Sequence, residues 1–135
     1  MYHLCIITIK YLRTDQFERE KSFRTNDKLD SRYVVGLLEG PSDKEFEEGV
    51  KTLIVPQLNR KISDYPYCLV MPHGERNLRE IFLSERPDQH EIRTLFRQVV
   101  KATKYMHDQG VIHGDLKKIN IVRVNGHLRM IDLDA

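Results

Sequence analysis

Short apolar runs separated by polar stretches fill the first half of the chain, and they predict strands joined by loops. The run LCIITI, residues 4–9, is rich in β-branched side chains and is followed by Lys10 and a polar stretch, which predicts a strand that ends in a loop. A helix is predicted over residues 16–26, because Thr14 or Asp15 can cap its first turn.

Two further apolar runs predict strands on either side of a charged stretch. The segment RYVVGLLEG, residues 32–40, predicts one strand, and YCLVM, residues 67–71, predicts a buried strand because Pro66 and Pro72 bound it. Residues 42–64 are charged and have no clear periodicity, so we interpret them as an insertion with one short helix.

The second half of the chain carries strong signals for helix ends. Asn77 with Glu80, and Asp88 with Glu91, have the spacing of capping boxes, so a helix is predicted to begin at each. Gly110 stands where the second helix would need a left-handed residue at its end. The apolar positions of that helix share one face, which we interpret as core rather than as a cofactor groove: Ile92, Leu95, Phe96, Val99 and Met106.

A β-hairpin is predicted near the end of the sequence. Residues 121–124 and 127–131 are apolar-rich runs that flank Asn125 and Gly126, a pair that favours a two-residue type I′ turn. The two strands of such a hairpin run back along each other, so the residues before the first strand and after the second are expected to lie together.

The composition changes this picture little. Of the 135 residues, 40% are hydrophobic and 31% are charged, which is typical of one globular domain with its own core. The net charge of +2 gives no reason to expect nucleic acid or an anionic membrane as a partner, and the apolar run near the start is too short to span a bilayer. Cys5 and Cys68 are interpreted as free buried thiols of a reducing compartment, which predicts the cytoplasm and leaves the nucleus open.

The candidate chemistry lies around the hairpin. The hairpin returns Asp132 to the side of Asn120, and one carboxylate with one amide suits a magnesium ion that takes its other ligands from water and phosphate. In the same segment, HGDLKKIN at residues 113–120, Asp115 can accept a proton from an attacking hydroxyl group and Lys117 can offset phosphoryl charge. These residue types together predict phosphoryl transfer.

The order and spacing of His113, Asp115, Asn120 and Asp132 resemble the catalytic loop and metal-binding triplet of eukaryotic-type protein kinases. Lys117 stands two residues after Asp115, and in this the loop resembles that of serine/threonine kinases rather than tyrosine kinases. The resemblance implies that Asp115 is the catalytic base, that Lys117 contacts the γ-phosphate of ATP, and that Asn120 and Asp132 bind Mg²⁺. We interpret His113 as a packed structural residue, and a protein hydroxyl as the acceptor.

The resemblance extends upstream into the parts that would bind adenine. The segment YCLVMPHGERNLREIF, residues 67–82, is similar to the strand, hinge and first C-lobe helix of a kinase. This implies that Met71 is the gatekeeper and that Pro72 and Gly74 offer backbone groups to adenine, since proline keeps its carbonyl. It also implies that Val122 forms part of the apolar floor under the base.

The segment ITIK resembles the kinase strand that carries the ATP-binding lysine. The resemblance therefore assigns that role to Lys10 and makes Glu20 its helix partner. The expected fold is α+β, a partial protein kinase-like two-lobe fold. Residues 1–71 would form part of the N-lobe, with an insertion at about 41–64, and residues 72–135 would form the hinge and the first part of the C-lobe.

The sequence departs from the kinase pattern in four places. Its seven glycines form no GxGxxG, Gly114 replaces the usual arginine, and Asp134 replaces the glycine of the triplet. The sequence also ends at Ala135, where an activation segment would begin. We interpret the chain as a kinase domain incomplete at both ends, and expect very weak or no turnover by it alone because phosphoryl transfer depends on positioning.

Two other functions stay open. A small-molecule phosphotransferase of the aminoglycoside or choline kinase type also has a loop that reads HGD, but Lys117 and the YMHDQG segment favour the protein-kinase side. A non-catalytic pseudokinase scaffold is the third possibility. Binding of ATP with magnesium would discriminate against a scaffold that binds no nucleotide.

Overall fold

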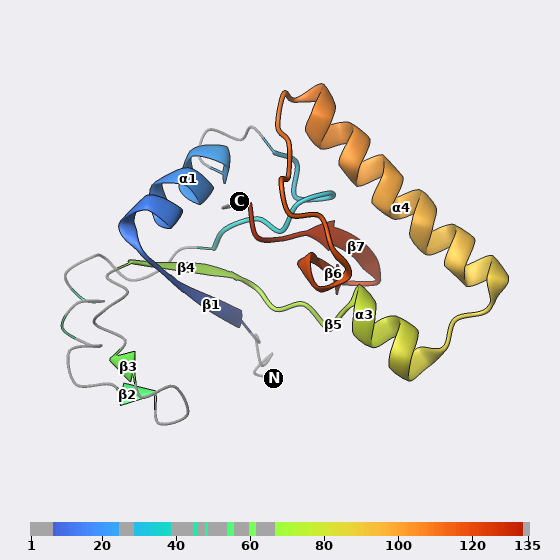
Figure 1. Cartoon of the computed structure of the whole chain (residues 1–135), viewed down its shortest axis with the longest axis horizontal. Coiled ribbons are helices and arrows are strands. Elements are labelled where there is room, and N and C mark those ends of the chain that lie inside the picture. The colour runs from blue at the N-terminus through green and yellow to red at the C-terminus, as the bar shows by residue number, and fades with distance from the viewer. Residues whose placement is uncertain are drawn as a thin grey trace, which may run out of the picture.

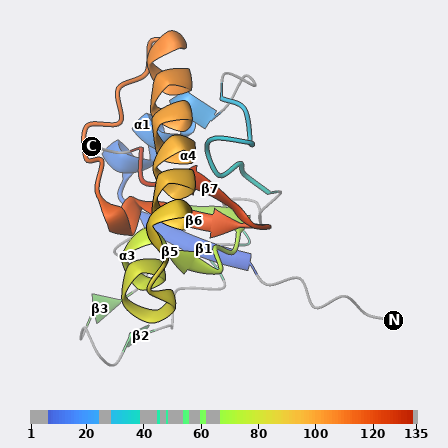
Figure 2. The ribbon, with the colours of Figure 1, turned by 90° about the vertical axis from the view of Figure 1, so that its right-hand side faces the viewer.

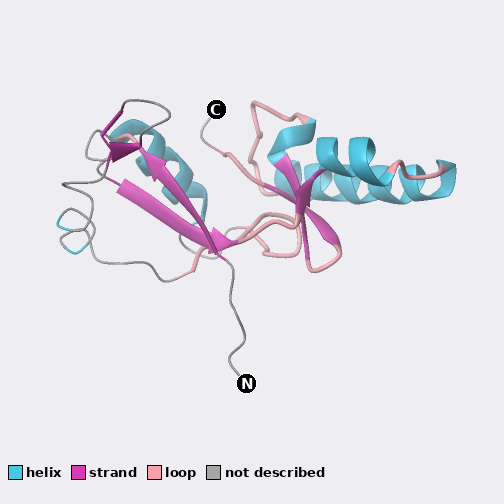
Figure 3. Ribbon diagram, turned by 90° about the horizontal axis from the view of Figure 1, so that it is seen from below, coloured by secondary structure: helices cyan, strands magenta, loops and turns pink. Residues whose placement is uncertain are grey.

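The computed structural model describes residues 7–24, 29–38, 45, 48, 54–55, 60–61 and 67–133. A small antiparallel sheet with one helix forms one part of the described chain, and a hairpin covered by a long helix forms the other (Figure 1, Figure 3). None of the helices in these residues is long and apolar enough to cross a membrane.

The first sheet consists of β1 (Ile7–Leu12) and β4 (Tyr67–Pro72), which pair antiparallel with Lys10 opposite Leu69. The buried strand predicted around residues 67–71 is confirmed. The predicted end of the first strand is wrong, because the backbone stays paired with β4 as far as Leu12, whose side chain is buried.

Helix α1 (Thr14–Arg24) begins earlier than predicted. Both predicted cap residues are already helical, because the Phe17 N–H donates to the Arg13 carbonyl at 2.9 Å and so closes the first turn one residue upstream of Thr14. Phe17 is buried and stacks on Tyr67, with 4.5 Å between the ring centroids. This contact fixes α1 against β4. Residues 25–26, where the predicted helix would end, lie outside the described residues.

The strand predicted over residues 32–40 is wrong for the part that the structure describes. Only Val34 forms a bridge there, with Met130 of the hairpin. The segment then crosses to the other sheet, where the Leu38 N–H donates to the Val70 carbonyl at 2.8 Å. Because its partners lie on two different sheets, the segment is a connector between them rather than a strand of either.

Most of the predicted insertion at 41–64 lies outside the described residues. Within it, β2 (Ile54–Val55) and β3 (Arg60–Lys61) pair antiparallel. Glu45 and Glu48 are helical, as the predicted short helix would require, but the residues around them are not described.

Both predicted capping boxes are confirmed. In the first, Asn77 Oδ1 accepts from the Glu80 N–H at 2.9 Å and Glu80 Oε2 accepts from the Asn77 N–H at 2.8 Å. The helix that follows is short: α3 (Leu78–Glu80) continues directly as a π-helical turn, η2 (Ile81–Glu85). The first box therefore starts a compact turn that leads to the long helix.

The second capping box starts α4 (Gln89–Asp108). Asp88 Oδ1 and Glu91 Oε2 each accept a backbone N–H of the other residue at 2.8 Å. Gly110 has φ = 74° just beyond the helix, as the sequence predicts. Figure 2 shows α4 running across the strands of the hairpin.

The predicted hairpin is confirmed and gains a third strand. The 3₁₀ turn η3 (Lys118–Asn120) leads into β6 (Ile121–Val124), which pairs with β7 (His127–Met130) on one side. The short β5 (Arg76–Asn77) pairs with β6 on its other side. Asn125 and Gly126 have φ values of 50° and 78°, which is the left-handed pair that a type I′ turn requires.

Two apolar clusters hold these parts together. One joins α4, α3 and the hairpin and includes Ile81, Met106 and Met130, while the other joins β1, α1 and β4 and includes Leu12, Phe17 and Met71.

The apolar face predicted as core on α4 is only partly buried. Met106 is buried and Leu95 and Val99 pack against the first cluster, but Ile92 is 38% and Phe96 66% exposed. The interpretation of this whole face as core is therefore wrong, because the described chain covers the C-terminal half of the face more fully than the N-terminal half.

Candidate functional site

The centre of the candidate site is an ammonium group held by two carboxylates. Lys10 Nζ, from β1, lies 2.6 Å from Glu20 Oε2 of α1 and 2.8 Å from Asp132 Oδ1, which follows β7. Glu20 is fully buried, whereas 21% of the Lys10 side chain is exposed. The predicted Lys10–Glu20 pair is thus present, and the contact with Asp132 is an addition that the sequence did not indicate.

The environment of Lys10 favours its charged form. Burial alone would lower the pKa of Lys10, but the hydrogen bonds to Asp132 and Glu20 and their negative charges outweigh burial and raise the pKa above its usual 10.5. Lys10 is therefore a cation at neutral pH, as a group that binds phosphate must be.

Arg24 holds the second oxygen of Glu20, and sequence reasoning missed it. Arg24 Nη2 lies 2.8 Å from Glu20 Oε1, one helical turn away, and Arg24 Nη1 donates to the Val35 carbonyl. The Arg24 side chain is only 2% exposed. Its spacing of four residues from Glu20 was the available signal, since residues at this spacing are neighbours on a helix surface.

Asp132 reaches the site through an unusual backbone conformation. Its φ is 59°, in the left-handed region that aspartate tolerates better than most residues other than glycine. The preceding Ile131 N–H donates to the Asn120 carbonyl at 3.0 Å. The hairpin therefore returns Asp132 to the side of Asn120, as predicted.

The loop before the hairpin is organised around a buried histidine. His113 Nε2 lies 2.7 Å from the Ile131 carbonyl, and because that oxygen only accepts, Nε2 carries the proton. His113 Nδ1 then accepts from the Asp115 N–H at 3.4 Å. His113 thus ties the loop to the strand end next to Asp132, which agrees with its interpretation as a structural residue.

Asp115, Lys117 and Asn120 form a second charged cluster. Lys117 Nζ lies 2.5 Å from Asp115 Oδ2, and Asn120 Nδ2 donates to the backbone oxygen of Asp115 at 3.0 Å and to Oδ2 at 3.2 Å. The hydrogen bond from Lys117 is the main reason that the pKa of Asp115 lies below its usual 3.8. Asp115 is consequently ionised at neutral pH and able to accept a proton.

The residues predicted to contact adenine lie at the passage from β4 to β5. Met71 is buried at the end of β4, and Pro72 closes the strand. A Cβ atom at Gly74 would come within 2.8 Å of Val122 Cβ, so glycine allows the backbone here to lie directly against β6. The structure thereby places Gly74 directly against Val122.

The ligand chemistry fits magnesium bound together with phosphate. Asn120 uses its Nδ2 atom for Asp115, which leaves Oδ1 as the amide atom for a cation, and Asp132 supplies a carboxylate. Over the ranges that the structure describes, no group of three or more His, Cys, Asp and Glu side chains is placed to hold a metal. A magnesium ion here would take its remaining ligands from water and phosphate, as such ions usually do. Asp134 lies outside the described residues.

Residues 6–135 match the protein kinase domain family, and the chain belongs to this family. The predicted kinase-like fold is confirmed, and the predicted serine/threonine type agrees with the serine/threonine-protein kinases among the relatives of the chain. The structure resembles the crystal structure of the yeast RNA Pol II CTD kinase CTDK-1 complex with a TM-score of 0.66 at 18% identity, covering 95% of this chain and 38% of that one. At this identity the likeness shows the fold alone.

The relatives in sequence are much longer proteins. The chain is 38% identical over 77 residues to the serine/threonine-protein kinase PSK2 of Saccharomyces cerevisiae, a match that covers 53% of this chain and 7% of that protein. It is 30% identical over 132 residues to the nitrogen permease reactivator protein of the same yeast, covering 96% of this chain and 15% of that protein. The chain thus spans less than a sixth of each of these relatives.

Proposed function

We propose that this chain carries the ATP-binding and catalytic residues of a serine/threonine protein kinase, which transfers the γ-phosphate of ATP to a hydroxyl group of a protein. The observation that supports this most is the contact of Lys10 with both Glu20 and Asp132, at 2.6 and 2.8 Å. It gathers one phosphate-binding cation and one metal-binding carboxylate from distant segments. The cytoplasm is the proposed compartment.

Each residue has a definite part in this proposal. Lys10, oriented by Glu20, would contact the phosphates, and Asn120 with Asp132 would hold Mg²⁺. When bound, ATP with Mg²⁺ supplies the phosphoryl group and neutralises part of its charge. The backbone groups of Pro72 and Gly74 would orient adenine, with Met71 and Val122 as apolar contacts.

Asp115 would accept the proton of the protein hydroxyl as that oxygen attacks phosphorus. Lys117 already lies 2.5 Å from Asp115 Oδ2, so it holds positive charge where the transferred group would pass. Lys10 and Asp132 neutralise each other in this structure. When ATP and Mg²⁺ bind, Lys10 would contact the phosphates and Asp132 would coordinate the metal.

Calorimetric titration of the 135-residue chain with ATP tests the binding step. We expect binding that requires Mg²⁺ and that becomes at least about tenfold weaker in Lys10→Met and in Asp132→Asn, since each removes a charged contact. Lys104→Met is the matched control, because Lys104 pairs with Asp108 on an exposed part of α4. Absence of binding would favour the pseudokinase scaffold and overturn the proposal.

The acceptor class needs a separate assay. Labelled phosphate from ATP is offered to a generic protein substrate, to small alcohols and to aminoglycosides. We expect very little transfer of labelled phosphate. Any transfer should label the protein substrate, and Asp115→Asn should abolish it. Transfer to the small molecules alone would assign the chain to the small-molecule phosphotransferases.

A further inference from the structure

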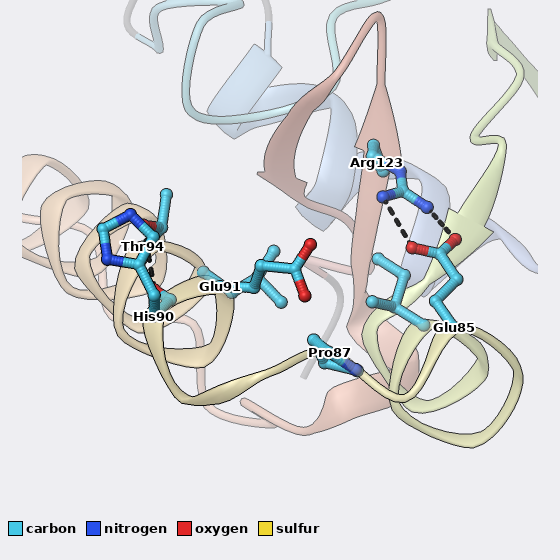
Figure 4. A pocket seen from close by; sticks show the side chains of 8 residues that line it. Glu85, Pro87, His90, Glu91, Thr94 and Arg123 are labelled. Atoms are coloured by element: carbon cyan, nitrogen blue, oxygen red, sulfur yellow. Dashed lines mark hydrogen bonds and ion pairs between the residues drawn. The ribbon is translucent and has the colours of Figure 1, made fainter.

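Of the hollows outside the candidate site that carry charged side chains, two differ clearly in how positive and negative groups are paired. The first, of about 340 Å³, lies between η2, the start of α4 and β6 (Figure 4). In it Arg123 forms a two-pronged ion pair with Glu85, which Arg76 also contacts at 2.8 Å. Arg123 Nε has no hydrogen-bond partner among the described residues, but it lies 3.5 Å from Glu75 Oε2. Carboxylates therefore match the positive charge in the first hollow, and it gives no reason to expect an anion.

The second hollow, of about 400 Å³, lies between α4, β7 and the connector of residues 29–38. Basic side chains dominate its lining: Arg32, Lys101, His127 and Arg129. Among the residues that the structure describes, no acidic side chain lines it. Basic groups from three separate segments therefore face one concave surface.

The carboxylate of Asp30 pairs with one of these basic groups, Arg32. Asp30 accepts hydrogen bonds from Arg32 Nε and Nη2 at 2.8 and 2.6 Å. These bonds, rather than the more distant charge of Arg129, are the main reason that the pKa of Asp30 is lowered. In the part of the chain that is described, the structure shows no ion pair for Lys101 or Arg129.

Arg129 also has a donor that lacks an acceptor. Its Nε atom is buried and has no hydrogen-bond partner among the described residues. A buried donor without a partner is costly, and an anion that reached it would remove that cost. The amide of Gln98 adds a second donor, because its Oε1 already accepts the Leu128 N–H at 2.8 Å and its NH₂ group remains.

We propose that this hollow binds a phosphoryl group. A guanidinium, an ammonium and an amide NH₂ offer donors alone, and a phosphoryl group offers three acceptor oxygens and up to two negative charges. The hollow is larger than one such anion, and Tyr33 and Leu128 give it apolar contacts for a chain that carries the anion. A phosphorylated protein segment and free phosphate are the two sources of this chemistry.

The inference is independent of the proposed kinase activity, because none of the residues assigned to ATP, magnesium or the acceptor lines this hollow. It would give the domain a second phosphate-recognising surface, at which a phosphorylated partner could bind.

The test uses the 135-residue chain labelled with ¹⁵N, in which the Nε–H signal of Arg129 is assigned by its loss in Arg129→Gln. Three probes are titrated: a short alanine peptide with one phosphoserine, the same peptide with serine, and inorganic phosphate. We expect the phosphopeptide to shift the Arg129 signal and the serine peptide to leave it unchanged. Arg129→Gln should weaken phosphopeptide binding at least about tenfold.

Arg79→Gln is the matched control, because it removes the same charge from an exposed position on α3 outside the hollow. If Arg129→Gln does not fold, Lys101→Gln on the exposed side of α4 provides the same comparison. Tighter binding of the phosphopeptide than of phosphate assigns the site to a phosphorylated segment, and equal binding assigns it to free phosphate. Failure of both to bind, or equal binding by wild type and Arg129→Gln, would overturn the proposal.

Discussion

Lys10 Nζ and Asp132 Oδ1 lie 2.8 Å apart, although the two residues come from opposite ends of the sequence. The pair connects β1 of the first sheet to the chain that leaves the hairpin. Because 21% of the Lys10 side chain and 38% of the Asp132 side chain are exposed, the pair itself contributes no more than about 1 kcal/mol. Its importance is therefore positional: it keeps the proposed phosphate-binding cation and the proposed metal-binding carboxylate next to each other before any ligand arrives.

Neutralising the buried carboxylate at the centre of the site should destabilise the fold. Glu20→Gln leaves Lys10 and the buried Arg24 without their shared anion, so we expect the free energy of unfolding to fall by about 3–5 kcal/mol. Urea denaturation followed by circular dichroism measures this loss. Glu18→Gln, at an exposed position of the same helix, should change stability by less than about 0.5 kcal/mol. Equal effects of the two substitutions would contradict the assignment of Glu20.

Arg24 should act as a positioning residue for Lys10 through Glu20. Arg24→Met frees Glu20 Oε1 and the Val35 carbonyl, so we expect ATP affinity to fall about fivefold or more. Arg24→Lys, which keeps the charge, should restore part of that loss. Titration calorimetry measures the affinities, with exposed Arg13→Met as the control. An unchanged affinity in a folded Arg24→Met variant would show that Arg24 has only a structural role.

The ion pair between Asp115 and Lys117 should be visible in the titration of the carboxylate. Since the folded-state pKa of Asp115 is below its usual 3.8, the pair stabilises the fold above about pH 3.8, and this stabilisation is lost as the pH falls through the folded-state pKa. Lys117→Met should raise the pKa of Asp115 towards 3.8. Carboxyl ¹³C NMR of both proteins follows this change, and identical titration curves would exclude Lys117 as its cause.

The close approach of Gly74 to β6 should make this position intolerant of any side chain. In Gly74→Ala the new Cβ atom would lie 2.8 Å from Val122 Cβ, so the two strand segments must move apart and we expect a loss of about 1–3 kcal/mol. Gly36→Ala is the matched control, because its Cβ atom would lie 3.7 Å from Ser31 Cβ, an ordinary contact. Thermal unfolding should separate the two variants, and similar melting temperatures would argue against the tight packing at Gly74.

Local rules predicted the parts of the fold that depend on neighbours in sequence. The capping boxes at Asn77 and Asp88 and the Asn125–Gly126 turn are confirmed, because each is determined by a few adjacent residues. Residues 32–40 have the β-branched pattern of a strand, yet the described part forms one bridge at Val34, because its hydrogen-bond partners lie on two sheets. No local pattern contains that information.

The candidate site was also predicted only in part, because local motifs identify residues but not their long-range contacts. The kinase-like motif identified Asp115, Asn120 and Asp132, whereas the contact of Asp132 with Lys10 depends on how two distant segments pack. The exposure of Phe96 was missed for a similar reason, since helical periodicity shows that a face is apolar but not whether anything covers it.

The packing of Gly74 against Val122 also bears on how the protein is made. The two residues are 48 positions apart, so at about 5–20 residues per second the ribosome needs roughly 2–10 seconds to add Val122 after Gly74. During that interval the segment after β4 lacks the strand that it finally lies against. Nascent chains would therefore expose the segment around Gly74 to chaperones and proteases for seconds, and a pause in translation within α4 would lengthen that exposure.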